Sequence, residues 1–168
     1  MEVFDAVRTV LAVRSYKDKP VPADLVRRIV EAARLTGSSM NAQPWHFIVV
    51  QKRETLRELG ALMQTGGYIA QAPLAIVVAV EKTQYAMSDG SRAIQSMVLT
   101  AWAEGVGSNW TGFGSAPKVN TLLGIPKDLD VLAILPFGYP AKALGKGKKK
   151  RKPLAQVAHG ERFSQPFK

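Results

Sequence analysis

The sequence of 168 residues predicts one α/β-type domain whose C-terminal end is an extended basic arm. Helix-type and strand-type segments are mixed along the chain, and no period of 20–50 residues recurs. No internal linker appears before residue 141, so the arm comprises residues 141–168 and the domain 1–168 as a whole. A chain of this length buries about 70% of the surface of its unfolded form, which is enough for one hydrophobic core.

The elements expected in the first half of the chain follow from the spacing of apolar residues. Apolar residues three and four positions apart indicate helices, and short continuous β-rich runs indicate buried strands. Prolines and glycines mark the boundaries between them. The pattern predicts, in order, a helix at about 2–13, a helix over 25–33 that Gly37 ends, a strand at 47–50, a helix over 56–62 and a strand at 74–80.

The second half continues the same alternation. Five apolar residues at i, i+3, i+4, i+7 and i+8 predict a long core helix from about 89 to 104. Residues 108–113 follow as a third strand or the end of one. Ser115 is placed to cap a short helix that runs through Leu123, and Val131–Leu135 is the fourth expected strand.

Composition excludes several chemistries. The chain has no cysteine, which excludes disulfides, thiolate metal sites and a cysteine nucleophile, and its two histidines argue against a zinc site. The longest apolar run, Leu74–Val80, is far shorter than the ~20 residues that a membrane span needs. Glu2 and Asp5 stand where a signal peptide would be basic, so we expect a cytoplasmic protein.

The net charge of +10 is concentrated in the arm, where nine Lys and Arg residues accompany a single Glu. Three interpretations are open for such an arm. It is a solvated tail, a nucleic-acid-binding arm that follows phosphates by charge, or a source of cations for one phosphate of a small ligand. The motifs in the rest of the chain have to decide among them.

Motifs for nucleotide binding and for nucleophilic catalysis fail in this sequence. Gly105-x-Gly107 follows a helix and has Trp110 where a dinucleotide fingerprint needs its third glycine. No P-loop pattern is present, and the nearest approach to a nucleophile elbow, at 37–41, ends in Asn. Hydrolytic chemistry with a side-chain nucleophile is therefore unsupported. Three polar clusters at turns remain as candidates: Arg14–Lys17, Ser38–Phe47 and Trp110–Gly114.

The cluster at residues 38–47 reads Ser-Ser-Met-Asn-Ala-Gln-Pro-Trp-His-Phe. This matches the pattern Ser-Ser-x-Asn-x-Gln-Pro-Trp-x-Phe of the nitroreductase family of FMN-dependent oxidoreductases, which the chain resembles over nearly its whole length. Any one motif is weak, and the ordered set is what carries the resemblance. The supporting motifs are, in chain order, Arg14–Lys17, Pro20–Pro22, Ala72–Pro73, Trp110–Phe113, Gly138–Pro140 and Lys149–Leu154.

The resemblance implies an α+β fold, a nitroreductase-like α/β/α sandwich with a mostly antiparallel central sheet. It further implies an intertwined homodimer with FMN in a cleft between the subunits. The arm itself is consistent with this assembly, because Leu154, Val157 and Phe163 are apolar residues that a free tail rarely carries. We therefore expect a C-terminal arm that reaches the dimer partner.

The resemblance also places the residues that bind the phosphate end of FMN. Arg14, Ser15 and Lys17 match the N-terminal FMN segment of the family. Lys149 and Arg151 match the pair that closes on the phosphate, which gives the charge of the arm a specific use. An arginine suits this task because its planar fork fits a phosphate and its charge does not titrate.

Two further motifs are implied to contact the rest of the flavin. Ser38, Ser39 and Asn41 match positions near the ribityl chain and the ring. Thr111 and Gly112 match a turn whose backbone amides face the N5 and O4 region of the ring.

The chemistry implied by the resemblance belongs to the flavin. Hydride passes from NAD(P)H to flavin N5 and leaves negative charge on the N1–C2=O edge, where Lys17 is the expected cation. Quinone, nitroaromatic or similar small-molecule acceptors then use the same face of the ring in a ping-pong scheme. Met40 is expected to border this substrate side.

One departure and one ambiguity leave alternatives open. Val13 stands where the family usually has Arg or His, which removes one expected phosphate cation. With the basic arm, this leaves open a flavin-binding or nucleic-acid-binding protein without reductase turnover. Flavin-fragmenting or dehalogenating relatives share the same motifs, although the short span of residues 66–89 leaves little room for a substrate lid.

Overall fold

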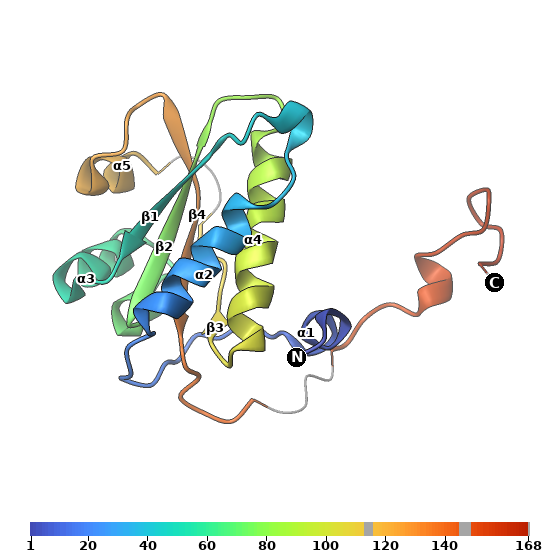
Figure 1. Ribbon diagram of the computed structural model, residues 1–168, viewed down its shortest axis with the longest axis horizontal. Coiled ribbons are helices and arrows are strands. Elements are labelled where there is room, and N and C mark those ends of the chain that lie inside the picture. Colours follow the sequence, from blue (N-terminus) through green and yellow to red (C-terminus); the bar gives the residue numbers. More distant parts are fainter. Residues whose placement is uncertain (113–115, 145–148, 168) are drawn as a thin grey trace.

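The computed structural model of the protein describes residues 1–112, 116–144 and 149–167 (Figure 1). Over these residues, the centre of the fold is a four-stranded sheet in the order β1-β2-β4-β3. Neighbouring strands pair antiparallel, which confirms the expected α+β class. The strands are β1 (Trp45–Val50), β2 (Leu74–Glu81), β3 (Gly107–Ser108) and β4 (Leu129–Gly138).

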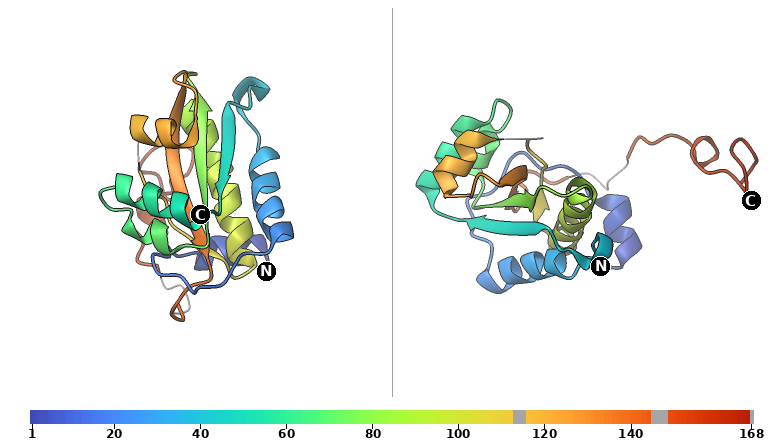
Figure 2. Two further views of the ribbon diagram at one scale, coloured as in Figure 1. Left: turned by 90° about the vertical axis from the view of Figure 1, so that its left-hand side faces the viewer. Right: turned by 90° about the horizontal axis from the view of Figure 1, so that it is seen from above.

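Helices cover both faces of this sheet. Side chains alternate along β2, so every second residue faces each side. One set packs with α2 (Ala23–Arg34) and α4 (Ala86–Ala103), and the other with α3 (Arg53–Leu62) and α5 (Pro117–Leu123). Figure 2 shows these two helical layers with the sheet between them. The α/β/α sandwich implied by the resemblance is therefore confirmed.

The first helix is shorter than its sequence pattern predicted. α1 is Val3–Thr9, and Val10 already has an extended backbone, whereas the apolar spacing predicted a helix to about residue 13. The chain instead turns to the sheet, where the Val13 N–H donates to the Ser108 carbonyl at 2.9 Å. Local periodicity carries no information about a partner so far along the chain, which explains the error.

The other elements lie where they were expected, with shifted ends. α4 begins at Ala86, three residues earlier than predicted, and β4 extends beyond the predicted run at both ends. β3 is confined to Gly107–Ser108. The N-cap position of α5 is Ala116, and the predicted cap Ser115 lies outside the described residues.

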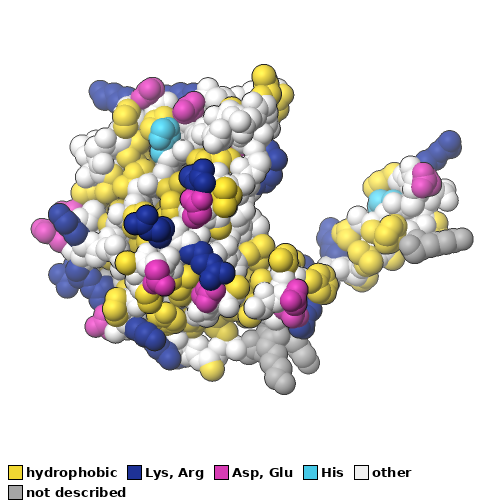
Figure 3. All heavy atoms as spheres, in the orientation of Figure 1, with side chains coloured by type: hydrophobic (Ala, Val, Ile, Leu, Met, Phe, Trp, Pro, Cys, Tyr) yellow, Lys and Arg dark blue, Asp and Glu magenta, His cyan; other side chains and the backbone are white. Residues whose placement is uncertain are grey.

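The last described part of the C-terminal arm, residues 154–167, extends away from the sandwich (Figures 1 and 2). Its tip folds back on itself, because the Gly160 N–H donates to the Gln165 carbonyl at 3.0 Å. Leu154 and Phe163 are 66% and 84% exposed. Figure 3 shows the hydrophobic side chains that gather on this arm. Within the described ranges, no helix has the length and apolar character needed to cross a membrane.

β3 approaches the N-terminal segment so closely that a side chain does not fit at position 107. A Cβ on Gly107 would lie 2.2 Å from Cγ2 of the buried Val13. We predict that Gly107→Ala lowers the free energy of unfolding by about 1–3 kcal/mol, the usual cost of overpacking. The urea midpoint measures this effect.

Gly37→Ala is the matched control, because a Cβ at Gly37 would meet nothing within 4 Å. Its midpoint should stay at the wild-type value. The double variant Val13→Ala/Gly107→Ala should recover part of the loss. A wild-type midpoint for Gly107→Ala alone would contradict the close approach.

Candidate functional site

Backbone hydrogen bonds attach the N-terminal segment after α1 to the end of β4. The Lys17 N–H donates to the Tyr139 carbonyl at 2.8 Å, and the Ala141 N–H donates to the Ser15 carbonyl at 2.9 Å. The side chains of Arg14, Ser15 and Lys17 are exposed. The segment therefore presents two cations and a hydroxyl from a fixed backbone.

Two side chains of the same segment point inward and anchor it. The buried Tyr16 donates its hydroxyl to the Val13 carbonyl at 2.6 Å. Burial raises the pKa of Tyr16, and the nearby Tyr68 adds to the effect. Val13 is 2% exposed and packs over Gly107. The chain therefore has a buried apolar side chain at the position where the family usually carries Arg or His, and the expected phosphate cation is absent there.

A cavity of about 880 Å³ opens between α1, α4 and the residues that follow β3. Its described lining holds three cations and no carboxylate, with apolar walls from α1, α4 and Trp110. The lining residues are Phe4, Val7, Arg8, Val10, Leu11, Ala12, Ile94, Gln95, Val98, Ser108, Asn109, Trp110, Lys149 and Arg151.

The base of the arm brings the predicted phosphate pair to this cavity. Lys149 donates from Nζ to the Val7 carbonyl of α1 at 2.5 Å. Burial lowers the pKa of Lys149, and the positive charge of Arg151 lowers it further. The structure thus brings Lys149 and Arg151 together in one basic cavity, and their role at a phosphate stays a prediction.

The turn after β3 departs from its expected role. The Thr111 N–H donates to the Ile134 carbonyl at 3.0 Å, and the Ile134 N–H donates back at 2.9 Å. Thr111 is 2% exposed, so its amide belongs to the sheet and is not available to a ligand. Gly112 is half-buried, and the next residues of the motif, 113–115, lie outside the described part of the chain.

A buried hydroxyl network supports this turn from behind. Tyr68, on the short helix η2 (Gly67–Gln71), shares a hydrogen bond of 2.6 Å with Thr111 Oγ1. Asn109 donates from Nδ2 to the Tyr68 hydroxyl at 2.6 Å, and Asn109 also lines the basic cavity. The sequence analysis missed Tyr68 and Asn109, because neither residue stands in a motif that marks it.

Residues 38–43 form a turn with an unusual backbone. Met40, Asn41 and Gln43 have φ values of 55°, 55° and 50°, in the left-handed region that residues with a Cβ rarely adopt. The Gln43 N–H donates to Ser38 Oγ at 2.9 Å across the turn. Met40 is 91% exposed, and its expected place on the substrate side of a flavin stays a prediction.

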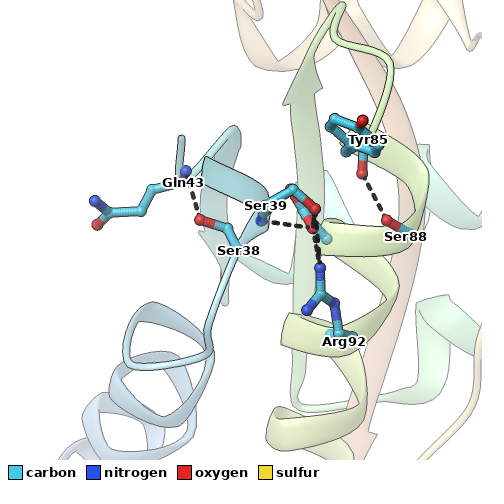
Figure 4. Close-up of polar contacts among 7 residues, drawn as sticks. Ser38, Ser39, Gln43, Tyr85, Ser88 and Arg92 are labelled. Atoms are coloured by element: carbon cyan, nitrogen blue, oxygen red, sulfur yellow. Dashed lines mark hydrogen bonds and ion pairs between the residues drawn. The ribbon is translucent and has the colours of Figure 1, made fainter. Parts of the chain in front are cut away.

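The turn is held from α4 by a buried carboxylate that the sequence analysis also missed (Figure 4). Ser39 donates to Asp89 from its N–H at 3.1 Å and from its hydroxyl at 3.0 Å. Arg92 pairs with the same carboxylate and donates to Ser39 Oγ at 3.3 Å. Burial raises the pKa of Asp89, but the bonds from Ser39 and Arg92 outweigh it and hold the pKa below its usual value.

The residues expected to bind one flavin lie in two groups at opposite ends of α4. Ser39 contacts Asp89 near the start of the helix. Trp102, near its end, borders a second cavity of about 500 Å³ that Lys17 also lines. At 1.5 Å per residue, the two helix positions are about 20 Å apart. One chain therefore does not bring the Ser38–Asn41 turn to the N-terminal segment.

The fold is an α/β/α sandwich with a basic cavity beside α1 and α4, and comparison with known proteins assigns the family. The model of the Nitroreductase family matches residues 8–66 and 65–139, so the chain belongs to the nitroreductase family and is an oxidoreductase. A protein from Methanothermobacter thermautotrophicus, provisionally named an NADH dehydrogenase/NAD(P)H nitroreductase, is 32% identical over 154 residues. The match covers 86% of this chain and 81% of that protein.

Solved structures and further relatives agree with this assignment. An FMN-dependent nitroreductase from Clostridium difficile superimposes with a TM-score of 0.87 at 26% identity, covering 95% of this chain and 99% of that one. An FMN reductase [NAD(P)H] from Bacillus subtilis is 26% identical, in an alignment that covers 96% of this chain and 74% of that protein. An iodotyrosine deiodinase from Nematostella vectensis also matches, at 24% identity over 93% of this chain and 74% of that protein.

The network behind Thr111 makes a testable contribution to stability. Tyr68→Phe removes the hydroxyl that Thr111 and Asn109 share, so Thr111 Oγ1 loses this partner and Asn109 Nδ2 keeps its bond to the Trp110 carbonyl at 3.0 Å. We predict a loss of about 1–3 kcal/mol in the free energy of unfolding, measured by urea denaturation. Tyr85→Phe, at a 42% exposed tyrosine, is the control and should change it by less than ~0.5 kcal/mol. Equal values for the two variants would rule the network out.

Proposed function

We propose that this protein is an FMN-dependent oxidoreductase that takes a hydride from NAD(P)H and passes two electrons to a quinone, nitroaromatic or similar small acceptor. The observation that carries this proposal is the cavity whose charged lining, in the described residues, is entirely basic. Its family membership and the FMN named for two of its relatives support it. When bound, FMN supplies the hydride and electron chemistry in a ping-pong exchange of donor and acceptor.

The residues of the cavity fit the parts of FMN. Arg151 offers a planar guanidinium and Lys149 an ammonium group, which together suit a phosphate dianion. Leu11, Ile94 and Val98 give an apolar wall for a flat ring. A volume of about 880 Å³ lies within the range of about 300–1,000 Å³ that small-molecule and cofactor sites occupy.

The remaining predicted residues are assigned supporting tasks. Arg14 and Ser15 extend the polar surface for the phosphate end. Lys17 holds a fixed positive charge where the ring carries negative charge after reduction. Ser38, Ser39 and Asn41 bind the ribityl chain and ring edge.

Two residues are assigned to the face of the ring where donor and acceptor meet. Gly112 contributes its backbone, with Thr111 holding the turn from the sheet side. Met40, 91% exposed, borders the acceptor. None of these residues is required as a proton donor or base, which agrees with the absence of a catalytic motif in the sequence.

The separation of the two residue groups leads us to propose a homodimer in which each site draws on both chains. The exposed apolar residues support this arrangement. Val3 and Phe4 on α1 are 77% and 74% exposed, and Leu154 and Phe163 lie exposed on the arm. Because exposed apolar side chains are unfavourable in water, we propose that the arm crosses to the partner subunit and that these side chains are buried there.

The alternatives receive less support. Dehalogenation is suggested by the deiodinase relatives, but the connection from β2 to α4 is only residues 82–85, too short for a lid at this place. Nucleic-acid binding would use the charge of the arm, but Lys149 is bonded to Val7 and both Lys149 and Arg151 line the cavity, which favours a small anionic ligand for this pair. The purified protein should therefore be yellow and should oxidise NAD(P)H with quinones or nitroaromatics. A colourless protein that fails to take up added FMN would contradict the proposal.

The phosphate contact can be tested by one substitution. We predict that Arg151→Ala weakens FMN binding by about 1.5–3 kcal/mol, the range for a hydrogen bond to a charged group. Riboflavin lacks the phosphate, so its affinity should not change. Arg57→Ala on α3, an exposed arginine remote from the cavity lining, is the control. A fluorescence titration in which both ligands lose affinity equally would show that Arg151 acts in another way.

The arm can be tested by truncation. Ending the chain after Leu144 removes the phosphate pair and the apolar arm residues but keeps the hydrogen bond between Ala141 and Ser15. We predict a lower dimer fraction by light scattering together with a lower flavin-to-protein ratio by absorbance. The full chain with Phe163→Ser should lose dimer stability while keeping both phosphate cations. A truncated protein that stays dimeric and loaded with FMN would refute the assignment of both tasks to the arm.

A further inference from the structure

Asp89 is a fully buried carboxylate to which the proposed reaction gives no chemical task. A buried ionised group is costly unless it is paired and hydrogen-bonded. Both of its oxygens accept from the Ser39 N–H, and Oδ1 also accepts from the Ser39 hydroxyl. Arg92, whose side chain is 51% exposed, supplies the opposite charge. The carboxylate therefore directs most of its hydrogen-bonding capacity at a single residue of the 38–43 turn.

That turn needs to be held. Left-handed backbone is unfavourable for residues with a Cβ, and it persists where surrounding contacts fix it. Met40, Asn41 and Gln43 are all left-handed, and several hydrogen bonds close the turn around them. Within the turn, the Asn41 N–H donates to the Ser38 carbonyl, the Ala42 N–H to the Ser39 carbonyl, and the Gln43 N–H to Ser38 Oγ. The attachment of Ser39 to Asp89 ties the turn to α4 (Figure 4).

The same contacts decide what the two serine hydroxyls can offer. Ser39 gives its hydroxyl hydrogen to Asp89 and accepts from Arg92, which leaves it one lone pair and no hydrogen to donate. Ser38 accepts from Gln43, and in the described part of the chain no group takes its hydrogen. The turn thus presents one donor at Ser38 and one acceptor at Ser39.

We propose that Asp89 is a positioning residue that holds the 38–43 turn in its left-handed form and fixes the direction of the Ser39 hydroxyl. The turn then offers a donor and an acceptor side by side, a pattern that suits the ribityl hydroxyls or the imide edge of a flavin. This inference rests on the proposed function for the identity of the ligand. The geometry of the turn stands independently of it.

Asp89→Asn tests the inference with little change of shape. An amide keeps an acceptor for the Ser39 N–H but loses the charge, and its NH₂ group turns the Ser39 hydroxyl around. In protein without FMN, we expect the amide hydrogen of Ser39 to exchange at least about tenfold faster. We expect the dissociation constant of FMN, from a fluorescence titration, to rise by about tenfold. Asp24→Asn, at an exposed aspartate in the first turn of α2, is the matched control. It should leave both the Ser39 exchange rate and the FMN dissociation constant at their wild-type values.

A double variant separates positioning from general destabilisation. If Asp89 acts through Ser39, then the double variant Ser39→Ala/Asp89→Asn should bind FMN less than about twofold more weakly than Asp89→Asn alone. The kcat of Asp89→Asn at saturating FMN should stay within about twofold of wild type, because the carboxylate touches no reacting atom. Multiplicative losses in the double variant, or a loss of kcat that FMN does not restore, would overturn the inference.

Arg92→Ala provides a second variant if Asp89→Asn fails to fold. It keeps the buried carboxylate, removes one partially exposed side chain, and should speed the exchange of Ser39 by a few-fold. Wild-type exchange at Ser39 in both variants would refute the positioning role. A wild-type protein that binds no FMN would refute the proposed function instead, and the exchange measurement would still decide the role of Asp89.

Discussion

The burial of β2 on both faces is the constraint on which the rest of the structure depends. A strand with no solvent-facing side needs backbone partners at both edges and apolar cover on both faces. β1 and β4 provide the partners, and two pairs of helices provide the cover. α4 lies close against the sheet at Gly90, where a Cβ would lie 2.5 Å from Cδ2 of Leu132 on β4. The path of α4 across the sheet then fixes where its two ends present their polar residues.

The position of α4 explains why the candidate site is divided. The Ser38–Asn41 turn is attached at one end of this helix, and the N-terminal segment lies at the other. The cations that line the basic cavity come from two terminal regions, Arg8 from α1 and Lys149 and Arg151 from the arm. Lys149 joins these regions physically, because it reaches from the arm to the backbone of α1. Two of the nine Lys and Arg residues of the arm thus line one cavity.

The two turns of the proposed site depend on polar groups that lie behind them. Asp89 holds Ser39 from α4, and Tyr68 holds Thr111 from η2. Through the described part of the chain, every buried side-chain nitrogen and oxygen has a hydrogen-bond partner. A fully satisfied buried network is rigid, since any displacement leaves a polar group without its partner in a medium where that is costly. Such support suits a site whose task is to position a cofactor.

The sequence by itself determined the strands β1, β2 and β4, the amphipathic helices and the family, because these follow from short-range spacing and ordered motifs. By resemblance it also named Arg14, Lys17, Lys149 and Arg151 as candidate FMN contacts, which stay predictions. Only the tertiary structure decided which groups meet across the chain. It buried Val13 against Gly107, gave the amide of Thr111 to β4, and placed Asp89 under Ser39. These partners are dozens of residues apart, and local periodicity carries no record of them, because their pairing is set by how the helices and strands pack.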